Sequence, residues 1–353
     1  MNSGVRLETI DGKCENCGNN LKFCPQEDTL KCEKCASKHK VENTCHNRKM
    51  PYNNINDDAL LDWQKQQKYI KCKSCGSTIN LKNNEISIEC PYCESQNIVL
   101  QKDIQGLYPT QIIRFAFDRH EASLKFKEQV KKKFLVPRKF KQLIPENEIE
   151  GYYYPAFSFD VDSFSKYDGK LYRYEKRGSG DNARTVTVYF DIHGEVNVQH
   201  RDVLVESSSR LTQYELHNLL PYDFTKRADF KPDYLFGYKV EQYNEQFKNA
   251  IIRSDEIVKE QIRNNILKKY SYDGVSTLNI NTNYGLQSFS YFMMPVYTFE
   301  YKYKDKKYLT YMNGQTGKVG SGLPVSKVKV AFITLFAILI VLLPILLVFF
   351  LGD

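Results

Sequence analysis

The chain has 353 residues and a formal net charge of +8 at pH 7, which is enough length for two or three domains and at least one hydrophobic core. Hydrophobic residues make up 42% of it, a share that is ordinary for globular proteins and excludes a disordered or collagen-like chain. The ten cysteines need an explanation as disulfides or as metal ligands.

A cysteine pattern at 10–50 recurs 58 residues later, at 71–100, as a second C-x2-C-x14-C-x2-C segment. Each first pair is followed by a glycine, which suits a tight turn, and short strand-like runs separate the pairs. Four thiolates at this spacing form the closed tetrahedral sites of structural zinc, with no position left for water or substrate. The sequence therefore predicts two zinc ribbons with two structural Zn²⁺ ions. The predicted ligands are Cys14, Cys17, Cys32, Cys35, Cys72, Cys75, Cys90 and Cys93.

Three other side chains near the first ribbon could take part in metal binding. Cys24 falls inside the predicted hairpin, and Cys45 and His46 follow the ribbon. The simpler interpretation is a packed thiol at Cys24 and an exposed Cys-His pair. The alternative is that Cys45 or His46 replaces one of the ribbon ligands.

The charge of residues 1–100 bears on what the ribbons bind. Residues 1–100 contain 14 Lys and Arg and 13 Asp and Glu, and each Zn(Cys)4 centre would add negative charge. Phosphate contacts require clustered cations, so the ribbons favour protein recognition, with nucleic-acid binding as the alternative. The segment 51–70, which contains Trp63, is predicted to be a helix linking the two ribbons.

Residues 105–320 predict an α+β domain. A helix is expected at about 120–134 and another at about 241–269, and alternating apolar and polar residues predict strands between and after them. Asp168-Gly169 and His193-Gly194 suggest turns of an antiparallel meander. The stretches at 154–159 and 294–299 resemble each other and suggest two related halves. The fold class expected for the whole chain is therefore α+β, with two small ribbons ahead of this domain.

The segment 328–351 predicts a transmembrane helix. Residues 330–351 carry no charge, and about 20 apolar residues span a bilayer as a helix. Lysines precede this segment, and no apolar stretch follows Met1 as in a signal peptide. The expectation is a tail-anchored, single-pass cell-membrane protein with most of its chain in the cytoplasm. That reducing compartment would favour metal binding over disulfides.

No catalytic constellation is recognisable, so no enzymatic activity is expected. The segment 314–319, GQTGKV, has two residues between its glycines and a valine where a phosphate-binding loop needs Ser or Thr. His193 and Glu195 with the second ribbon's cysteines have the reverse order of a zinc deaminase signature. His120, His200 and His217 are isolated in the sequence.

Several segments together resemble a bacterial family of transcription factor IIB-type zinc-ribbon proteins, sometimes labelled primosomal helicase-like. These segments are LYPTQIIRF at 107–115, FLVP at 134–137, GYYYP at 151–155, YMNGQTGKV at 311–319 and LPVSK at 323–327. The resemblance implies a membrane-anchored protein with no assigned reaction, and its metal ligands correspond to the eight cysteines given above. The helicase label does not carry over, because this sequence has no ATP-binding loop. The resulting hypothesis is a non-enzymatic adaptor that recognises a protein partner at the membrane.

Overall fold

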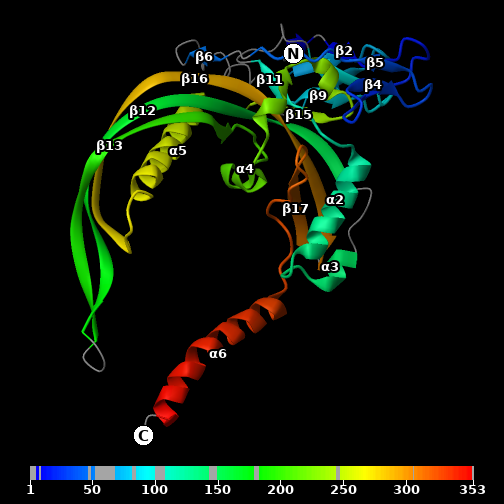
Figure 1. The fold of residues 1–353 in the computed structure, drawn as a ribbon. Coiled ribbons are helices and arrows are strands. Elements are labelled where there is room, and N and C mark those ends of the chain that lie inside the picture. Colours follow the sequence, from blue (N-terminus) through cyan, green and yellow to red (C-terminus); the bar gives the residue numbers. More distant parts are fainter. Residues whose placement is uncertain are drawn as a thin grey trace.

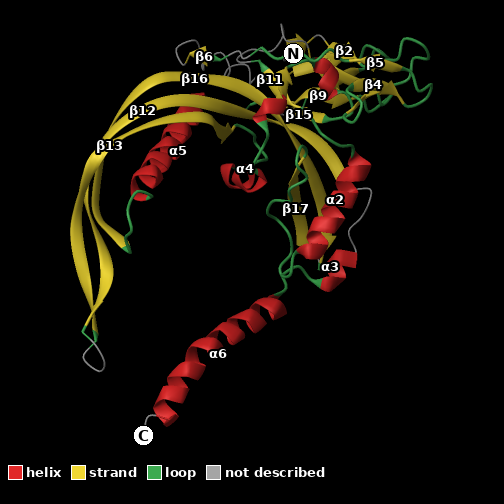
Figure 2. Cartoon of the chain, in the orientation of Figure 1, coloured by secondary structure: helices red, strands yellow, loops and turns green. Residues whose placement is uncertain are grey.

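The computed structural model is built mainly from β-strands (Figure 2). It describes residues 5–7, 9–46, 49–51, 68–81, 85–99, 108–142, 149–178, 183–243, 247–304 and 306–351. Most of the segment 51–70 that was predicted to be a linking helix, including Trp63, lies outside the described residues. The side chains of α6 are described only as far as Leu342.

One mixed sheet of eleven strands organises the molecule. Its main path runs β14 (Arg227–Asp229), β11 (Gln111–Ile113), β16 (Gly274–Tyr303), β12 (Ile149–Arg177), β15 (Lys239–Glu241), β9 (Glu85–Glu89), β10 (Gln96–Val99) and β2 (Thr9–Asp11). Beside this path, β13 (Arg184–Glu206) pairs with β12, while β17 (Lys306–Asn313) and β6 (Met50–Pro51) pair with β16.

Two three-stranded sheets carry the rest of the cysteine-rich region. One consists of β1 (Val5–Leu7), β7 (Lys68–Lys71) and β8 (Thr78–Asn80), and the other of β3 (Leu21–Cys24), β4 (Thr29–Cys32) and β5 (Lys38–Lys40). The helices are α2 (Arg119–Lys132), α3 (Arg138–Gln142), α4 (Gln213–Leu219), α5 (Phe247–Leu267) and α6 (Lys327–Leu351), with short 3-10 turns η3 (Phe224–Lys226) and η4 (Pro232–Leu235).

The predicted fold class is wrong in two respects. The protein is mostly sheet, and although β12 pairs antiparallel with β13 and β16 as expected, the short strands β11 and β15 join the same sheet in parallel. The ribbons are not separate small domains either, because β9 and β10 of the second ribbon, together with β2, continue the large sheet. The physical reason is that residue alternation identifies a strand but does not identify its partner.

The two predicted glycine turns do not exist, because β12 and β13 run straight through them. Gly169 lies in β12 opposite Ile192, and a Cβ there would lie 2.5 Å from the carbonyl oxygen of Thr277. A Cβ at Gly194 would lie 2.8 Å from the hydroxyl of Tyr167. These glycines permit close approach within a three-stranded ladder, a known role of glycine inside strands.

The two similar sequence stretches lie side by side at the centre of the sheet. Tyr154 of β12 pairs with Met294 of β16 in an antiparallel register. Next to them, β11 runs parallel to β16 with Ile112 opposite Met293, and β15 runs parallel to β12 with Val240 opposite Tyr153. Each half therefore follows the order short strand, helix, long strand and partner strand, with α2 in one half and α5 in the other.

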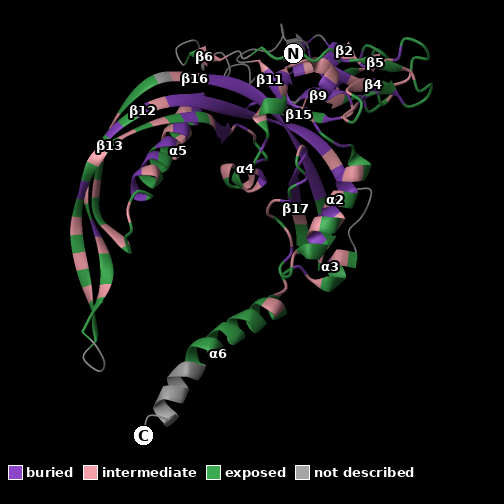
Figure 3. Cartoon of the chain, in the orientation of Figure 1, coloured by how far each residue is buried: buried purple, intermediate pink, exposed green. Residues whose placement is uncertain are grey.

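The core lies where the helices cover the long strands. Phe157 of β12 is fully buried and packs edge-on against Phe247 of α5, with ring centroids 4.9 Å apart. On the other half, Phe126 of α2 stacks on Phe299 of β16 at 3.7 Å. The long strands bend into an arch with α5 on its concave side (Figure 1). Burial is continuous at the centre of the sheet and alternates toward the distal end of β12 and β13 (Figure 3).

The C-terminal helix α6 leaves the body beside α3 and is exposed along its described part (Figures 1 and 3). Its start is held by Lys329, whose ammonium donates to the carbonyl oxygens of Phe134 at 2.6 Å and Val136 at 3.0 Å.

The membrane predictions need correction. In the part of the chain whose side chains are described, no helix combines the length and the apolar character needed to cross a membrane. This finding overturns the transmembrane helix at 328–351, the tail anchor, the single-pass membrane partner and the cell-membrane location.

Candidate metal centres

Four turns of the same design carry the eight predicted ligands. In each turn the backbone N–H of the first cysteine donates to the carbonyl five residues on, and the residue after the second cysteine donates back to the first cysteine. In the first turn these bonds are Cys14 N–H to Asn19 O and Gly18 N–H to Cys14 O, both 2.8 Å. Gly18 and Gly76 have φ of 69° and 77°, as the tight turn requires. Ala36 and Glu94 adopt the same left-handed conformation in the other two turns, with φ of 58° each.

The structure brings the eight cysteines together in two groups of four. Within each group all four sulfurs lie within 4.8 Å of one another, and all ten cysteines of the chain are free thiols. Measured sulfur separations are 3.5 Å for Cys14–Cys35 and 3.7 Å for Cys72–Cys93. Four sulfurs about 2.3 Å from a zinc ion at tetrahedral angles would be about 3.8 Å apart. The donor set and the spacing therefore fit two zinc ions, and this geometry supports metal binding without reference to the cell compartment.

Hydroxyl groups surround the sulfurs. Ser37 Oγ lies 3.1 Å from the sulfur of Cys14 and 3.2 Å from that of Cys35. This hydrogen bond from Ser37 lowers the pKa of Cys35 to about 6. In the second group, burial raises the pKa of Cys72, but hydrogen bonds from Ser95 and from backbone amides outweigh it, and the pKa falls to about 6. The low pKa values of Cys35 and Cys72 favour the thiolate that a metal requires. A backbone hydrogen bond from Asn19 lowers the pKa of Cys17, but burial and the neighbouring sulfurs outweigh it and raise that pKa to about 11.

The serines were not identified from the sequence, although a signal for one pair was present. Ser37 and Ser95 occupy equivalent positions in the repeat, each two residues after the last cysteine of its group. A hydroxyl at that position in both copies could have been identified as a partner of the sulfurs.

The three additional ligand candidates lie outside both groups. The Cys24 thiol contacts only the side-chain oxygen of Gln26, at 3.6 Å, among the contacts described. The imidazole of His46 instead pairs with Asp229, Nδ1 to Oδ2 at 2.5 Å, and the His46 backbone N–H donates to the same carboxylate. Neither Cys45 nor His46 replaces a ribbon cysteine.

The structure explains two further features of the sequence, the isolated histidine His200 and the segment that resembles a phosphate-binding loop. His200 is buried, and its ring nitrogens lie 2.9 Å from Ser163 Oγ and 2.7 Å from Gln261 Oε1. Ser163 is also buried, so this pairing of a hydroxyl and an imidazole has no access to substrate. In the segment that resembles a phosphate loop, Asn313 Oδ1 accepts from the backbone N–H groups of Gln315 and Thr316. Those amides are therefore already satisfied within the turn.

A polar cavity of about 580 Å³ lies where both ribbons meet the large sheet. The first ribbon contributes Lys22 and Glu33, the second contributes Glu89, and the sheet and α2 contribute Glu150, Lys239 and Arg119. Lys22 pairs with Glu33 at 2.8 Å and Lys239 pairs with Glu150. The ring of Tyr152 lies between two cations, with Arg210 5.7 Å and Lys239 5.4 Å from its centroid. The cavity therefore offers charges of both signs around an aromatic ring.

Comparisons with known proteins identify one relative of similar length. Over 326 residues the chain is 28% identical to an uncharacterised protein, YdjG, of Bacillus subtilis strain 168, covering 91% of this chain and 92% of the relative. No family model matches the chain, and no solved structure matches it. The name of this relative states no activity.

Proposed function

We propose that the protein is a non-enzymatic recognition module in which two structural zinc ions hold the ribbons in place for a protein partner. The observation that carries this proposal is the closure of both cysteine groups. Each group supplies four sulfurs at tetrahedral spacing, which leaves a zinc ion no open position for substrate or water.

The mixed charge of the cavity favours a protein as the partner. A nucleic-acid surface needs cations that are free to meet phosphates, whereas here Lys22 and Lys239 pair with Glu33 and Glu150. Tyrosine and arginine are enriched at protein–protein interfaces, and the cavity lining contains Tyr152, Arg119 and Arg210. Because both ribbons and the sheet line the cavity, a bound partner would contact all three parts.

The experiment is site-specific photocrosslinking of the full chain in cells, with a benzophenone side chain at Glu89 in the cavity. The control site is Glu128, which is exposed on the outer face of α2. A discrete protein adduct is expected from position 89 and not from position 128. The charge reversal Arg119→Glu should abolish that adduct.

Two results would contradict this proposal. Equal adducts from both positions would show that the cavity is not the binding element. Crosslinking of position 89 to nucleic acid would favour the alternative, a nucleic-acid-binding protein, and that outcome should also show a steep dependence on salt concentration.

A further inference from the structure

The two metal groups have identical ligands but different surroundings. The repeat of 58 residues aligns Ser37 with Ser95, and both are serine. It also aligns Asn19 with Ser77, where the two copies differ. This second pair of positions decides how many sulfurs have a hydroxyl partner.

In the second group every sulfur lies beside a hydroxyl. Ser95 Oγ is 3.2 Å from Cys72 and 3.1 Å from Cys93, and Ser77 Oγ is 3.0 Å from Cys75 and 3.4 Å from Cys90. A further donor, the side-chain amide of Asn97, lies 3.6 Å from the sulfur of Cys72.

In the first group only two sulfurs have a hydroxyl partner. Ser37 serves Cys14 and Cys35. No described hydroxyl lies beside the Cys17 and Cys32 sulfurs, which are 3.5 Å apart, and the Cys17 sulfur accepts a hydrogen bond from the backbone N–H of Asn19. Cys32 is fully buried whereas Cys17 is exposed. Cys17 therefore combines solvent access with the absence of a hydroxyl partner.

Hydrogen bonds to a metal-bound thiolate withdraw charge from the sulfur and stabilise its bond to the metal. A sulfur without a hydroxyl donor keeps more of its charge and is the better nucleophile, provided that a reagent can reach it. We propose that Cys17 is the most reactive of the eight ligand sulfurs towards soft electrophiles and that the first cysteine group is the one that opens.

The reaction is an alkylation. The Cys17 thiolate sulfur donates an electron pair to the carbon of an alkyl halide such as iodoacetamide, an S–C bond forms, the C–I bond breaks, and iodide leaves. The resulting thioether of Cys17 is no longer an anionic ligand. The group is left with three thiolates and loses its zinc to a chelator.

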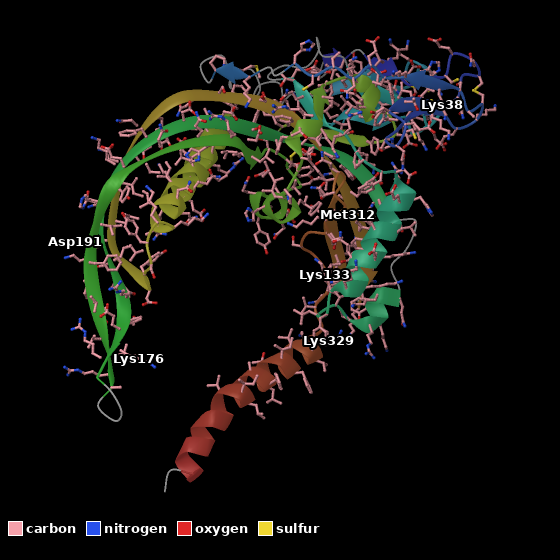
Figure 4. The ribbon with its side chains drawn as sticks, in the orientation of Figure 1. Lys38, Lys133, Lys176, Asp191, Met312 and Lys329 are labelled. Carbon is pink, nitrogen blue, oxygen red and sulfur yellow. The ribbon has the colours of Figure 1, made fainter. Side chains whose placement is uncertain are left out.

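The position of the first group in the fold limits the structural effect of losing its zinc ion to one ribbon. The first group is attached to the three-stranded sheet β3–β4–β5, whose outer strand carries Lys38 at the periphery of the molecule (Figure 4). In the second group Cys90 and Cys93 lie between β9 and β10 of the eleven-stranded sheet, and Cys72 and Cys75 lie between β7 and β8 of a three-stranded sheet. Opening the first group would release one ribbon from the cavity while the large sheet stays paired.

The test uses the full chain loaded with zinc, limiting iodoacetamide and a colorimetric zinc chelator. Alkylated cysteines are identified by mass spectrometry at the time when half of the fast-released zinc has appeared. Zinc release should occur in two phases of one ion each, and among the eight ligand cysteines Cys17 should carry the first label, whereas labelling of the free thiols Cys24 and Cys45 should release no zinc. Reciprocal exchange of the differing positions provides matched variants, Asn19→Ser and Ser77→Asn.

Asn19→Ser is expected to slow the fast phase by about tenfold, the lower end of the effect of an outer-shell hydrogen bond at a metal site. Ser77→Asn is expected to accelerate the slow phase and to expose Cys75 to labelling. Labelling of Cys75 or Cys93 before Cys17 in the wild-type chain, or rates that neither exchange alters, would overturn the inference.

This inference rests on the proposed function, because it requires zinc in both cysteine groups. The zinc content of the chain before alkylation distinguishes a failure of the proposed function from a failure of this inference. Fewer than two zinc ions per chain would refute both. Two zinc ions with the wrong order of labelling would refute only the reactivity of Cys17.

Discussion

The side chain of Gln96 joins the second ribbon to the segment that follows η4, with the backbone N–H of Gly237 donating to Gln96 Oε1 at 2.5 Å. On its other side, Gln96 Nε2 donates to the carbonyl oxygens of Leu235 at 3.1 Å and Tyr238 at 2.7 Å. One amide thus satisfies three backbone groups at the junction that forms the cavity. The ribbon is positioned by hydrogen bonds as well as by strand pairing.

Replacement of Gln96 by leucine should destabilise this junction. The backbone N–H of Gly237 would lose its partner, at a cost of about 1–3 kcal/mol if it stays buried, while the carbonyl oxygens of Leu235 and Tyr238 would keep hydrogen bonds from the Tyr238 N–H and from Ser87 Oγ. The free energy of unfolding, measured by urea denaturation of the zinc-loaded chain, checks this prediction. Gln199→Leu, at an exposed position on β13, is the control and should change stability little. Equal effects of the two substitutions would contradict the role assigned to Gln96.

Loss of the two metal groups should have unequal structural effects. Cys90→Ser opens the second group, whose strands β9 and β10 lie between β15 and β2 in the large sheet. Cys32→Ser opens the first group, which is attached to a separate three-stranded sheet. We expect the first variant to lose most of its cooperative thermal transition and the second to retain it. Circular dichroism during heating measures both, and the reverse order would contradict this assignment.

An alanine at Gly169 should strain the long three-stranded ladder. Its Cβ would lie 2.5 Å from the carbonyl oxygen of Thr277 and 3.0 Å from Cα of Leu278, and overpacking of this kind costs about 1–3 kcal/mol. Gly285→Ala is the matched control in the neighbouring strand, because the nearest atom to its Cβ would be 3.5 Å away. Urea denaturation should show a loss for Gly169→Ala alone.

Alkaline pH should weaken the fold in part through Tyr301. Burial raises the pKa of Tyr301 to about 12, and its hydroxyl lies 2.8 Å from Thr310 Oγ1. Because the folded pKa exceeds the ordinary tyrosine value of about 10, this contribution to stability is complete below pH 10. It is lost as the pH rises from about 10 to about 12.

The variant Tyr301→Phe should therefore lose stability less steeply over this pH range. The difference in slope can reach about 1.4 kcal/mol per pH unit for one tyrosine, measured by urea denaturation at several pH values between 8 and 11.5. Tyr214→Phe, at an exposed side chain on α4, is the control. A slope identical to that of the wild type would contradict the prediction.

Local features of the sequence were sufficient to group the eight cysteines and to place the helices α2 and α5. A zinc ribbon depends on short turns whose ligand spacing is visible along the chain, so Cys14 and Cys72 could be matched to their partners without a structure. The helices expected at 120–134 and 241–269 correspond to α2 and α5 for the same reason, since helical hydrogen bonds join residues only four apart. The prediction that 328–351 spans a membrane is not supported by the described part of α6.

Pairing between distant strands could not be predicted in this way. Gly169 and Gly194 look like turn residues along the chain, and only the approach of Thr277 and Tyr167 shows why they are glycines inside strands.

The sequence by itself determined which sulfurs can share a metal ion, because the spacing within each ribbon is set by turns of a few residues. Only the tertiary structure decided that the second ribbon continues the large sheet, that Gln96 ties it to Gly237, and that Cys17 lacks the hydroxyl partner that Cys75 has. Those relationships depend on contacts between residues that are far apart in the sequence. Such contacts produce no periodic pattern along the chain, so the sequence alone does not reveal them.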